Sequence, residues 1–98
     1  MDYLSYKGES YPIRVSYYAL KQYQSETGKG IETIDEDIAN LEILLFHSLV
    51  AGCKAEDKAL DLKREDMEFF LDESLTDFNS ILIGSFPQGK GGNSSKKK

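Results

Sequence analysis

Residues 35–51 carry the strongest helical pattern in this chain, and their apolar content limits what the rest of the sequence can build. Three acidic residues at positions 35–37 suit the positive end of a helix dipole, and Gly52 is expected to end the helix. Thr33 or Asp35 can cap its start. Apolar residues form one stripe and then spread around it: Ile38, Leu41, Leu45 and Leu49, with Ile43, Leu44, Phe46 and Val50 beside them. Such a helix is either the central helix of its domain or carries a second face for a partner, and both alternatives stay open.

Two short β-segments precede this helix. Residues 3–6 and 11–15 are rich in aromatic and β-branched side chains, and the polar stretch 7–10 between them predicts a hairpin with a four-residue loop. Pro12 cannot donate a ladder hydrogen bond, so the second strand is expected to lie at an edge or to start just after it. A two-stranded hairpin is only marginally stable alone and must pack on helices.

Further helices are expected on both sides of residues 35–51. Ser16 is a good N-cap for a helix over 17–27, and Gly28 supplies a left-handed stop. Residues 63–72 predict another helix, and the capping-box-like stretch 74–77 predicts the start of a last one. That last helix contains Leu75, Phe78, Ile81, Leu82 and Phe86, although residues 81–83 are also compatible with a short strand, and Pro87 ends the element.

The predicted fold class is therefore mainly α, with about four helices and a short N-terminal β-hairpin. A chain of 98 residues has room for one domain, which we place at residues 1–87. Residues 88–98 have no apolar side chain and are expected to form a flexible, basic tail of Gly, Ser, Asn and Lys.

Charge and composition exclude several classes of protein. The net charge of −5 argues against a nucleic-acid binder, which normally has a basic face. Cys53 is the only cysteine, so no intramolecular disulfide can form. The N-terminus lacks the pattern of a signal peptide, and the most apolar segment, 43–50, is far shorter than a membrane span. These features predict a cytoplasmic protein that contacts neither nucleic acid nor membrane.

No motif in the sequence indicates catalysis, a cofactor or a metal. Residues 84–90 fit G-x-x-x-x-G-K, but Gly91 follows where a phosphate loop needs Ser or Thr, and the lysine tail cannot form the required helix. The acidic run at 35–37 lacks the glycine of a calcium loop and suits a helix start better. His47 and Cys53 have no further His or Cys to complete a zinc site. We therefore expect no enzyme, no cofactor and no metal.

Tyrosines gather in the first quarter of the chain and suggest a binding surface. The adjacent pair Tyr17 and Tyr18 cannot both face one core, so at least one should be exposed. Tyrosine is common at protein interfaces because its ring buries much area while its hydroxyl stays hydrated. The expected partner-binding surface consists of Tyr17, Tyr18, Leu44, Phe46 and His47.

Three stretches of the chain resemble the tail assembly chaperones of long-tailed bacteriophages. In residues 11–23, YPIRVSYYALKQY, a short β-segment leads directly into a helix, and ETGK follows at 26–29. An acidic start at 35–37 leads into LEILLFHSLVAG at 41–52, and a late acidic helix covers 64–72 before a final apolar helix. The likeness covers residues 11–87, while the N-terminal hairpin departs from what the family pattern requires.

The resemblance implies a helical, non-catalytic protein that is made during virion assembly in the host cytoplasm and is absent from the mature virion. Such proteins bind the tape-measure protein, help recruit tail-tube protein and often self-associate. The main alternative is a small acidic phage-encoded inhibitor or DNA mimic that binds a host protein. An enzyme dependent on Cys53 and a structural head–tail or conjugation component are further alternatives.

Overall fold

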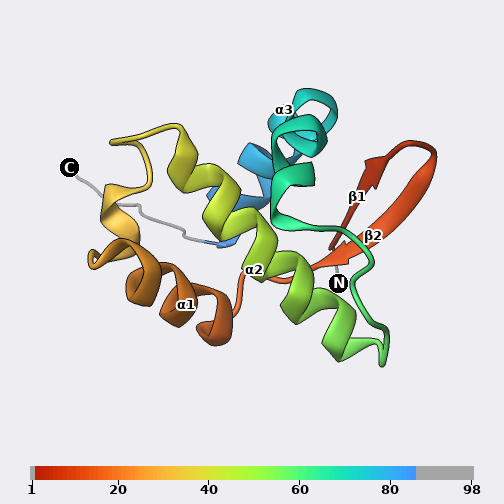
Figure 1. Ribbon diagram of the computed structural model, residues 1–98, viewed down its shortest axis with the longest axis horizontal. Helices are drawn as coiled ribbons and strands as arrows, with labels where there is room; N and C mark the ends of the chain where they lie inside the picture. The colour runs from red at the N-terminus through yellow and green to blue at the C-terminus, as the bar shows by residue number, and fades with distance from the viewer. Residues whose placement is uncertain (1, 86–98) are drawn as a thin grey trace.

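The computed structural model describes residues 2–85, which form a β-hairpin, three α-helices and two short 3-10 helices (Figure 1). In chain order the elements are β1 (Asp2–Tyr6), β2 (Glu9–Ile13), α1 (Tyr17–Thr27), η1 (Ile31–Thr33), α2 (Ala39–Ala55), η2 (Arg64–Asp66) and α3 (Met67–Ser85). The mainly α class with an N-terminal hairpin is confirmed, but the described part of the chain has three α-helices and not about four. The predictions for Phe86, Pro87 and the tail at 88–98 lie outside the described residues, as does most of the motif at 84–90.

The hairpin closes through a tighter turn than the sequence suggested. Tyr6 pairs with Glu9, so only Lys7 and Gly8 form the turn, and both have positive φ angles of 51° and 80°. This is the geometry of a two-residue turn whose twist matches that of the strands. The predicted four-residue loop is wrong, because its last two residues belong to β2. Pro12 is tolerated since, in a sheet of two strands, each strand is an edge.

Local signals set both ends of α1. The Ser16 side chain accepts a hydrogen bond from the N–H of Ala19, and Gly28 takes a left-handed conformation with φ of 76°. The N–H of Gly28 bonds back to the carbonyl of Gln24 at 2.8 Å. The predicted N-cap and C-terminal stop of this helix are confirmed.

Helix α2 begins and ends four residues later than the sequence predicted, since it covers residues 39–55 and not 35–51. At its start, the Asp37 side chain accepts from the N–H of Ala39 at 3.0 Å. At its end, Asp57 takes a left-handed conformation with φ of 58°, and the N–H of Lys58 returns to the carbonyl of Cys53 at 2.8 Å. This is a Schellman-type end in which aspartate replaces the usual glycine.

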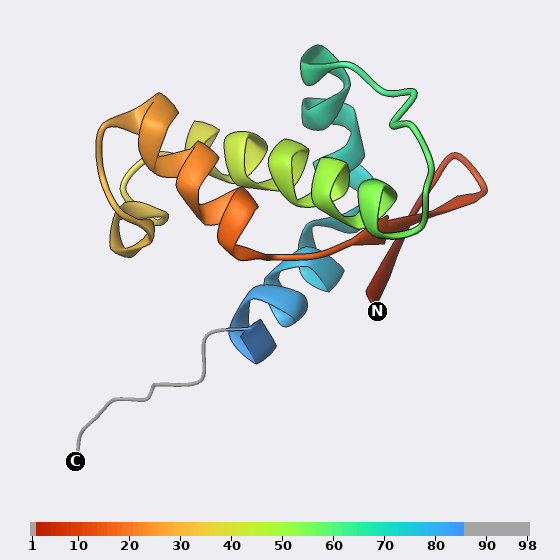
Figure 2. The ribbon, with the colours of Figure 1, turned by 90° about the horizontal axis from the view of Figure 1, so that it is seen from below.

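Helix α2 is the central helix of the domain. It lies beside α1 on one side, and it contacts β2 and α3 elsewhere (Figures 1 and 2). Gly52 lies inside the helix, where a Cβ atom would come within 2.3 Å of the Pro12 carbonyl oxygen. This close approach lets the N–H of Arg14 donate to the carbonyl of Ser48 at 3.0 Å. The predicted role of Gly52 as a helix stop is wrong, because the residue is needed for packing.

Helix α3 is one continuous helix where the sequence predicted two. Residues 74–77 do not start a new helix, because the Ser74 hydroxyl donates to the carbonyl of Ser5 on β1 at 2.6 Å. Met67, Phe70, Ser74 and Phe78 form a single buried stripe that packs on the hairpin and on α2. The strand alternative for residues 81–83 is also wrong, since they belong to α3.

One apolar core joins the hairpin to all three helices. Its buried members are Leu4, Tyr6, Ile13, Ala19, Tyr23, Leu44, Leu45, Leu49, Met67, Phe70 and Phe78. The Tyr23 hydroxyl donates to the Thr33 hydroxyl at 3.0 Å, which in turn donates to the Gly30 carbonyl at 2.7 Å. Through this buried pair, the core fixes η1 against α1.

Candidate functional site

The structure separates the five residues that the sequence assigned to a partner-binding surface. Leu44 has an exposed fraction of 0% and belongs to the core, so it cannot contact a partner in the folded domain. Tyr17 is 79% exposed, and Tyr18 is exposed to a smaller extent. Phe46 is half-buried and His47 is only 7% exposed. The placement of Leu44 on the surface is therefore corrected, while the two tyrosines do lie on the outside of α1.

His47 and Phe46 belong to a cluster of charged and aromatic side chains that connects three elements. We call it the Glu26 cluster, and it consists of Glu26, His47, Arg64, Tyr18 and Phe46. The Glu26 carboxylate of α1 bonds to the His47 ring on α2 and to the Arg64 guanidinium of η2. The Arg64 guanidinium also lies over the Phe46 ring, 5.4 Å from its centroid. The Tyr18 and His47 rings meet in a T-shaped arrangement, with centroids 6.2 Å apart.

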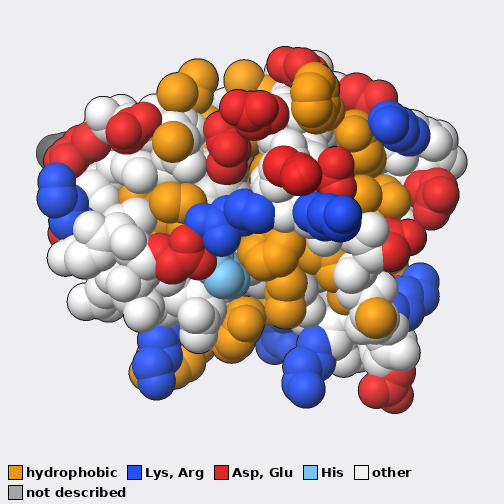
Figure 3. Space-filling view, in the orientation of Figure 1, with side chains coloured by type: hydrophobic (Ala, Val, Ile, Leu, Met, Phe, Trp, Pro, Cys, Tyr) orange, Lys and Arg blue, Asp and Glu red, His pale blue; other side chains and the backbone are white. Residues whose placement is uncertain are grey.

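Figure 3 shows the single histidine in a patch where acidic, basic and hydrophobic side chains meet. The partners of the Glu26 carboxylate lower its pKa below the ordinary value of 4.5, with Arg64 acting most strongly and His47 adding to it, against an opposing effect of burial. Because the Glu26 carboxylate bonds to both His47 and Arg64, the cluster acts first as a clamp that holds η2 and the start of α3 to the α1–α2 pair. The buried Nδ1 of His47 has no hydrogen-bond partner among the described residues.

We expect Glu26→Gln to lower the free energy of unfolding by about 1 kcal/mol near neutral pH, because the charged partner of Arg64 and His47 is lost. Since folding lowers the pKa of Glu26, its contribution is fully present above the ordinary value of 4.5 and is lost as the pH falls through the folded value. Urea denaturation at neutral and acidic pH measures both effects. The matched control is Glu36→Gln, because the pair of Glu36 with Lys29 is 3.6 Å long and exposed on both sides. Equal effects of the two substitutions would contradict a clamp at Glu26.

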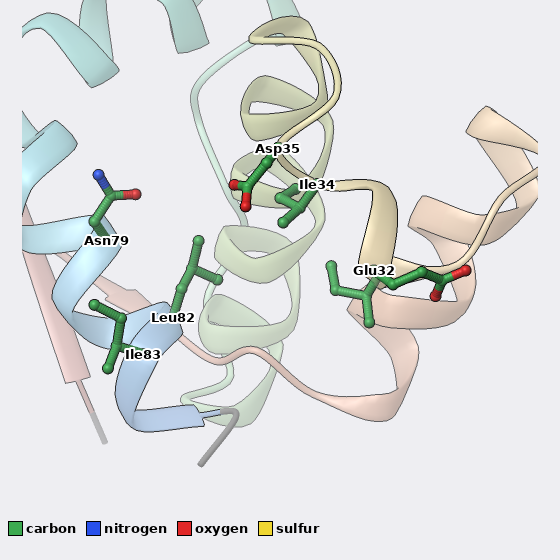
Figure 4. A pocket seen from close by; sticks show the side chains of 7 residues that line it. Glu32, Ile34, Asp35, Asn79, Leu82 and Ile83 are labelled. Carbon is green, nitrogen blue, oxygen red and sulfur yellow. The ribbon is translucent and has the colours of Figure 1, made fainter. Parts of the chain in front are cut away.

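A groove lies between η1 with the residues after it and the C-terminal part of α3. This η1–α3 groove has a volume of about 720 Å³ and is lined by Ile31, Glu32, Ile34, Asp35, Asn79, Leu82 and Ile83. In Figure 4, Leu82 projects from α3 toward Ile34 on the opposite wall. Ile83 is 74% exposed, which is unusual for so large an apolar side chain.

A second hollow continues the groove across α1. It is lined by Tyr17, Leu20, Lys21, Gln24, Gly30, Ile31 and Glu32, so it shares Ile31 and Glu32 with the groove. The exposed Tyr17 ring therefore belongs to a longer surface of mixed polar and apolar side chains that extends from α1 over η1 to α3. This surface, and not the predicted set around Leu44, is the strongest candidate for a binding site.

Sequence reasoning missed the groove because its walls are far apart in the chain. Asn79, Leu82 and Ile83 lie at i, i+3 and i+4, so they share one helical face, which borders the buried stripe because Leu82 lies one turn after Phe78. That spacing is visible in the sequence, but no pattern in the sequence pairs it with residues 31–35. Only the fold brings the two segments together.

Three further observations concern metal binding, the single cysteine and the membrane. Within residues 2–85, no group of three or more His, Cys, Asp or Glu side chains is placed to hold a metal ion. Cys53 is buried at the C-terminal end of α2, and burial raises the pKa of its thiol above the ordinary value. In the same part of the chain, each helix falls short of the length and apolar character that crossing a bilayer requires.

Comparison with known proteins does not assign the chain to a family. No protein-family model, no curated protein and no solved structure matches it. What the fold defines is a small, mainly helical domain with an N-terminal hairpin and an apolar groove.

Proposed function

We propose that this chain is a tail assembly chaperone of a long-tailed bacteriophage, a non-catalytic protein that binds the tape-measure protein during virion assembly. The observation that supports this function is the exposure of large apolar side chains, chiefly Ile83 and Tyr17, along the η1–α3 groove and the adjoining hollow on α1. A protein that keeps hydrophobic helices in solution needs exposed apolar surface of this kind. The net charge of −5 counters the aggregation that such a surface would otherwise cause.

The remaining parts of this function follow from the resemblance and belong to the same proposal. The chaperone acts in the cytoplasm of the host cell, helps to recruit tail-tube protein, self-associates and is absent from the mature virion. The Tyr17 and Tyr18 side chains, exposed on α1, provide a second contact surface beside the groove.

Two structural observations favour this class of protein over its rivals. A DNA mimic needs carboxylates arrayed on one surface. On the face shown in Figure 3, acidic side chains are interspersed with lysine, arginine and hydrophobic ones. An enzyme that uses Cys53 needs an accessible thiolate, whereas this thiol is buried and its pKa is raised.

We expect the Cys53 thiol to react with an aromatic disulfide reagent far more slowly in the native chain than in the urea-unfolded chain, by about a hundredfold or more, because reaction requires local opening. The release of the coloured thiol measures both rates. Equal rates in the native and unfolded chains would show an accessible thiol and would reopen the enzyme alternative.

The DNA that flanks the gene tests the proposed function. We expect a very long gene for a helical tape-measure protein to follow downstream, together with other tail genes. A slippery heptamer near the end of the reading frame would add support, because many proteins of this family are also made in a longer, frameshifted form. A gene neighbourhood without tail genes would contradict the proposal and would favour the inhibitor or DNA-mimic alternative.

A further inference from the structure

We propose that the η1–α3 groove binds an amphipathic helix of another protein, in which lysine or arginine residues flank the apolar stripe. This inference rests on the proposed function and adds to it the docking surface and the chemistry of the bound segment. It is drawn from the shape, composition and charge of the groove.

The groove presents apolar side chains on both walls. Ile31 and Ile34 come from the η1 side, and Leu82 and Ile83 come from α3. Three of these side chains are half-buried, and Ile83 is largely exposed, so together they form an open trough and not a closed cavity. An open apolar trough suits a row of side chains from one face of a helix.

The backbone of the walls favours a helix over an extended segment as the occupant. One wall is α3 and the other is the short 3-10 helix η1 with the turn that follows it, and the strands of the hairpin do not line the groove. An extended segment docked there would gain no ladder of backbone hydrogen bonds of the kind that a sheet edge offers. A helix satisfies its own backbone groups and needs only side-chain contacts.

The charge of the groove indicates basic flanks on the bound helix. Glu32 and Asp35 are exposed and take part in no ion pair within the described part of the chain. In Figure 4, the Asp35 carboxylate lies on the side of α3, whereas the Glu32 side chain extends away from α3. No lysine or arginine is among the residues that line this groove. A flanking lysine or arginine residue on a docked helix would meet the Asp35 carboxylate, and the Glu32 carboxylate adds negative charge at the rim of the groove.

The same charges disfavour a second copy of this chain as the occupant. The chain carries a net charge of −5, so an acidic groove would meet an acidic partner in a self-complex. The basic end of the chain, with Lys90 and the lysines at 96–98, is a rival occupant that the experiment must separate.

The test uses the full chain and two synthetic peptides of about five helical turns. Both have leucines at i, i+3, i+4 and i+7; one has lysines beside this stripe, and the other has glutamates in their place. We expect the lysine peptide to bind about tenfold more tightly or better, as measured by fluorescence anisotropy. Methyl NMR signals of Ile31, Ile34, Leu82 and Ile83 should shift during the titration.

Two variants and a matched control locate the site. Ile83→Asp should weaken binding of the lysine peptide about tenfold or more, because it places a charge among the apolar contacts. The double reversal Glu32→Lys with Asp35→Lys should invert the preference between the two peptides. Phe69→Asp is the control, because Phe69 is also exposed (60%) but lies near the other end of α3. The Phe69→Asp variant should bind the lysine peptide as tightly as the unchanged chain does.

Four results would overturn the inference. Absence of binding, or equal binding of the two peptides, would contradict the proposed chemistry of the partner. An equal loss of affinity in Phe69→Asp would place the site elsewhere. If the methyl NMR signals of the groove shift with protein concentration, a second copy of the chain is the occupant. A further variant replaces Lys90 and the lysines at 96–98 with serine. If this replacement shifts the groove signals in the absence of peptide, the chain's own end is the occupant.

The experiments distinguish a failure of this docking inference from a failure of the proposed function. If the peptides do not bind but the full chain still keeps a tape-measure protein in solution, the function stands and uses another surface, such as Tyr17 and Tyr18. If neither is observed, both proposals are wrong.

Discussion

Replacing Gly52 with alanine is expected to lower the free energy of unfolding by about 2 kcal/mol or more, although alanine is the better helix former. The added Cβ atom would lie 2.3 Å from the carbonyl oxygen and 2.5 Å from the carbonyl carbon of Pro12. These are backbone atoms, so β2 would have to move away from α2. That movement would also strain the hydrogen bond from the N–H of Arg14 to the Ser48 carbonyl.

Thermal and urea denaturation measure this effect, and a loss of 2 kcal/mol should lower the Tm by roughly 8–16 °C in a domain of this size. The matched control is Gly84→Ala, because Gly84 also lies in a helix and a Cβ there meets nothing within 4 Å. The control should be neutral or stabilising by up to about 1 kcal/mol. A stabilising effect of Gly52→Ala would mean that α2 and β2 do not approach as closely as the structure shows.

Replacing Leu44 with aspartate is expected to abolish the cooperative fold. Leu44 is completely buried in the core, and an unpaired carboxylate there costs several kcal/mol. The total stability of a small domain is only about 5–15 kcal/mol, so the loss is a large part of it. Circular dichroism and urea denaturation check this, with Tyr17→Asp as the control, because Tyr17 is exposed and its replacement should change stability by about 0.5 kcal/mol or less.

The opposite result would restore the original interpretation of Leu44. If Leu44→Asp keeps native stability but loses binding to a partner, then Leu44 lies on a binding surface and the core described above is wrong. The two substitutions therefore separate a residue that supports the fold from a residue that contacts a partner.

The parts of the fold that were predictable from sequence depend on interactions between near neighbours. Ser16 and Gly28 bond to groups three or four residues away, and their positions mark the ends of α1. The hairpin was also recognisable, because its strands are adjacent in the chain. Its turn was misjudged, since a non-glycine residue, Lys7, takes a positive φ angle beside Gly8.

The errors arose where distant contacts or uncommon cap residues decide the structure. Ser74 resembles a helix cap, but its hydroxyl bonds to Ser5, 69 positions away in the chain. Gly52 resembles a helix stop, but it sits in α2 where β2 packs. Asp57 ends this helix in a conformation that glycine adopts more readily, so an aspartate at this position is only a weak signal of a helix end.

The candidate site was the least predictable part, for the same reason. The sequence shows that residues 38–50 are unusually apolar. Whether the apolar side chains outside the main stripe face the core or a partner depends on the packing of three other elements. In the structure, most of these side chains pack in or against the core. Ile38, in the stripe itself, is an exception, with an exposed fraction of 78%. The groove is formed instead by residues 31–35 and 79–83, which become neighbours only in the folded chain.

The most direct test of the proposed function is co-expression of the full chain with the tape-measure protein encoded next to it. We expect the chaperone to raise the soluble fraction of the tape-measure protein severalfold and to co-purify with it. Ile83→Asp should lose both effects, while Phe69→Asp should keep them. A tape-measure protein that is equally soluble with and without the chain, and that does not co-purify with it, would contradict a chaperone function.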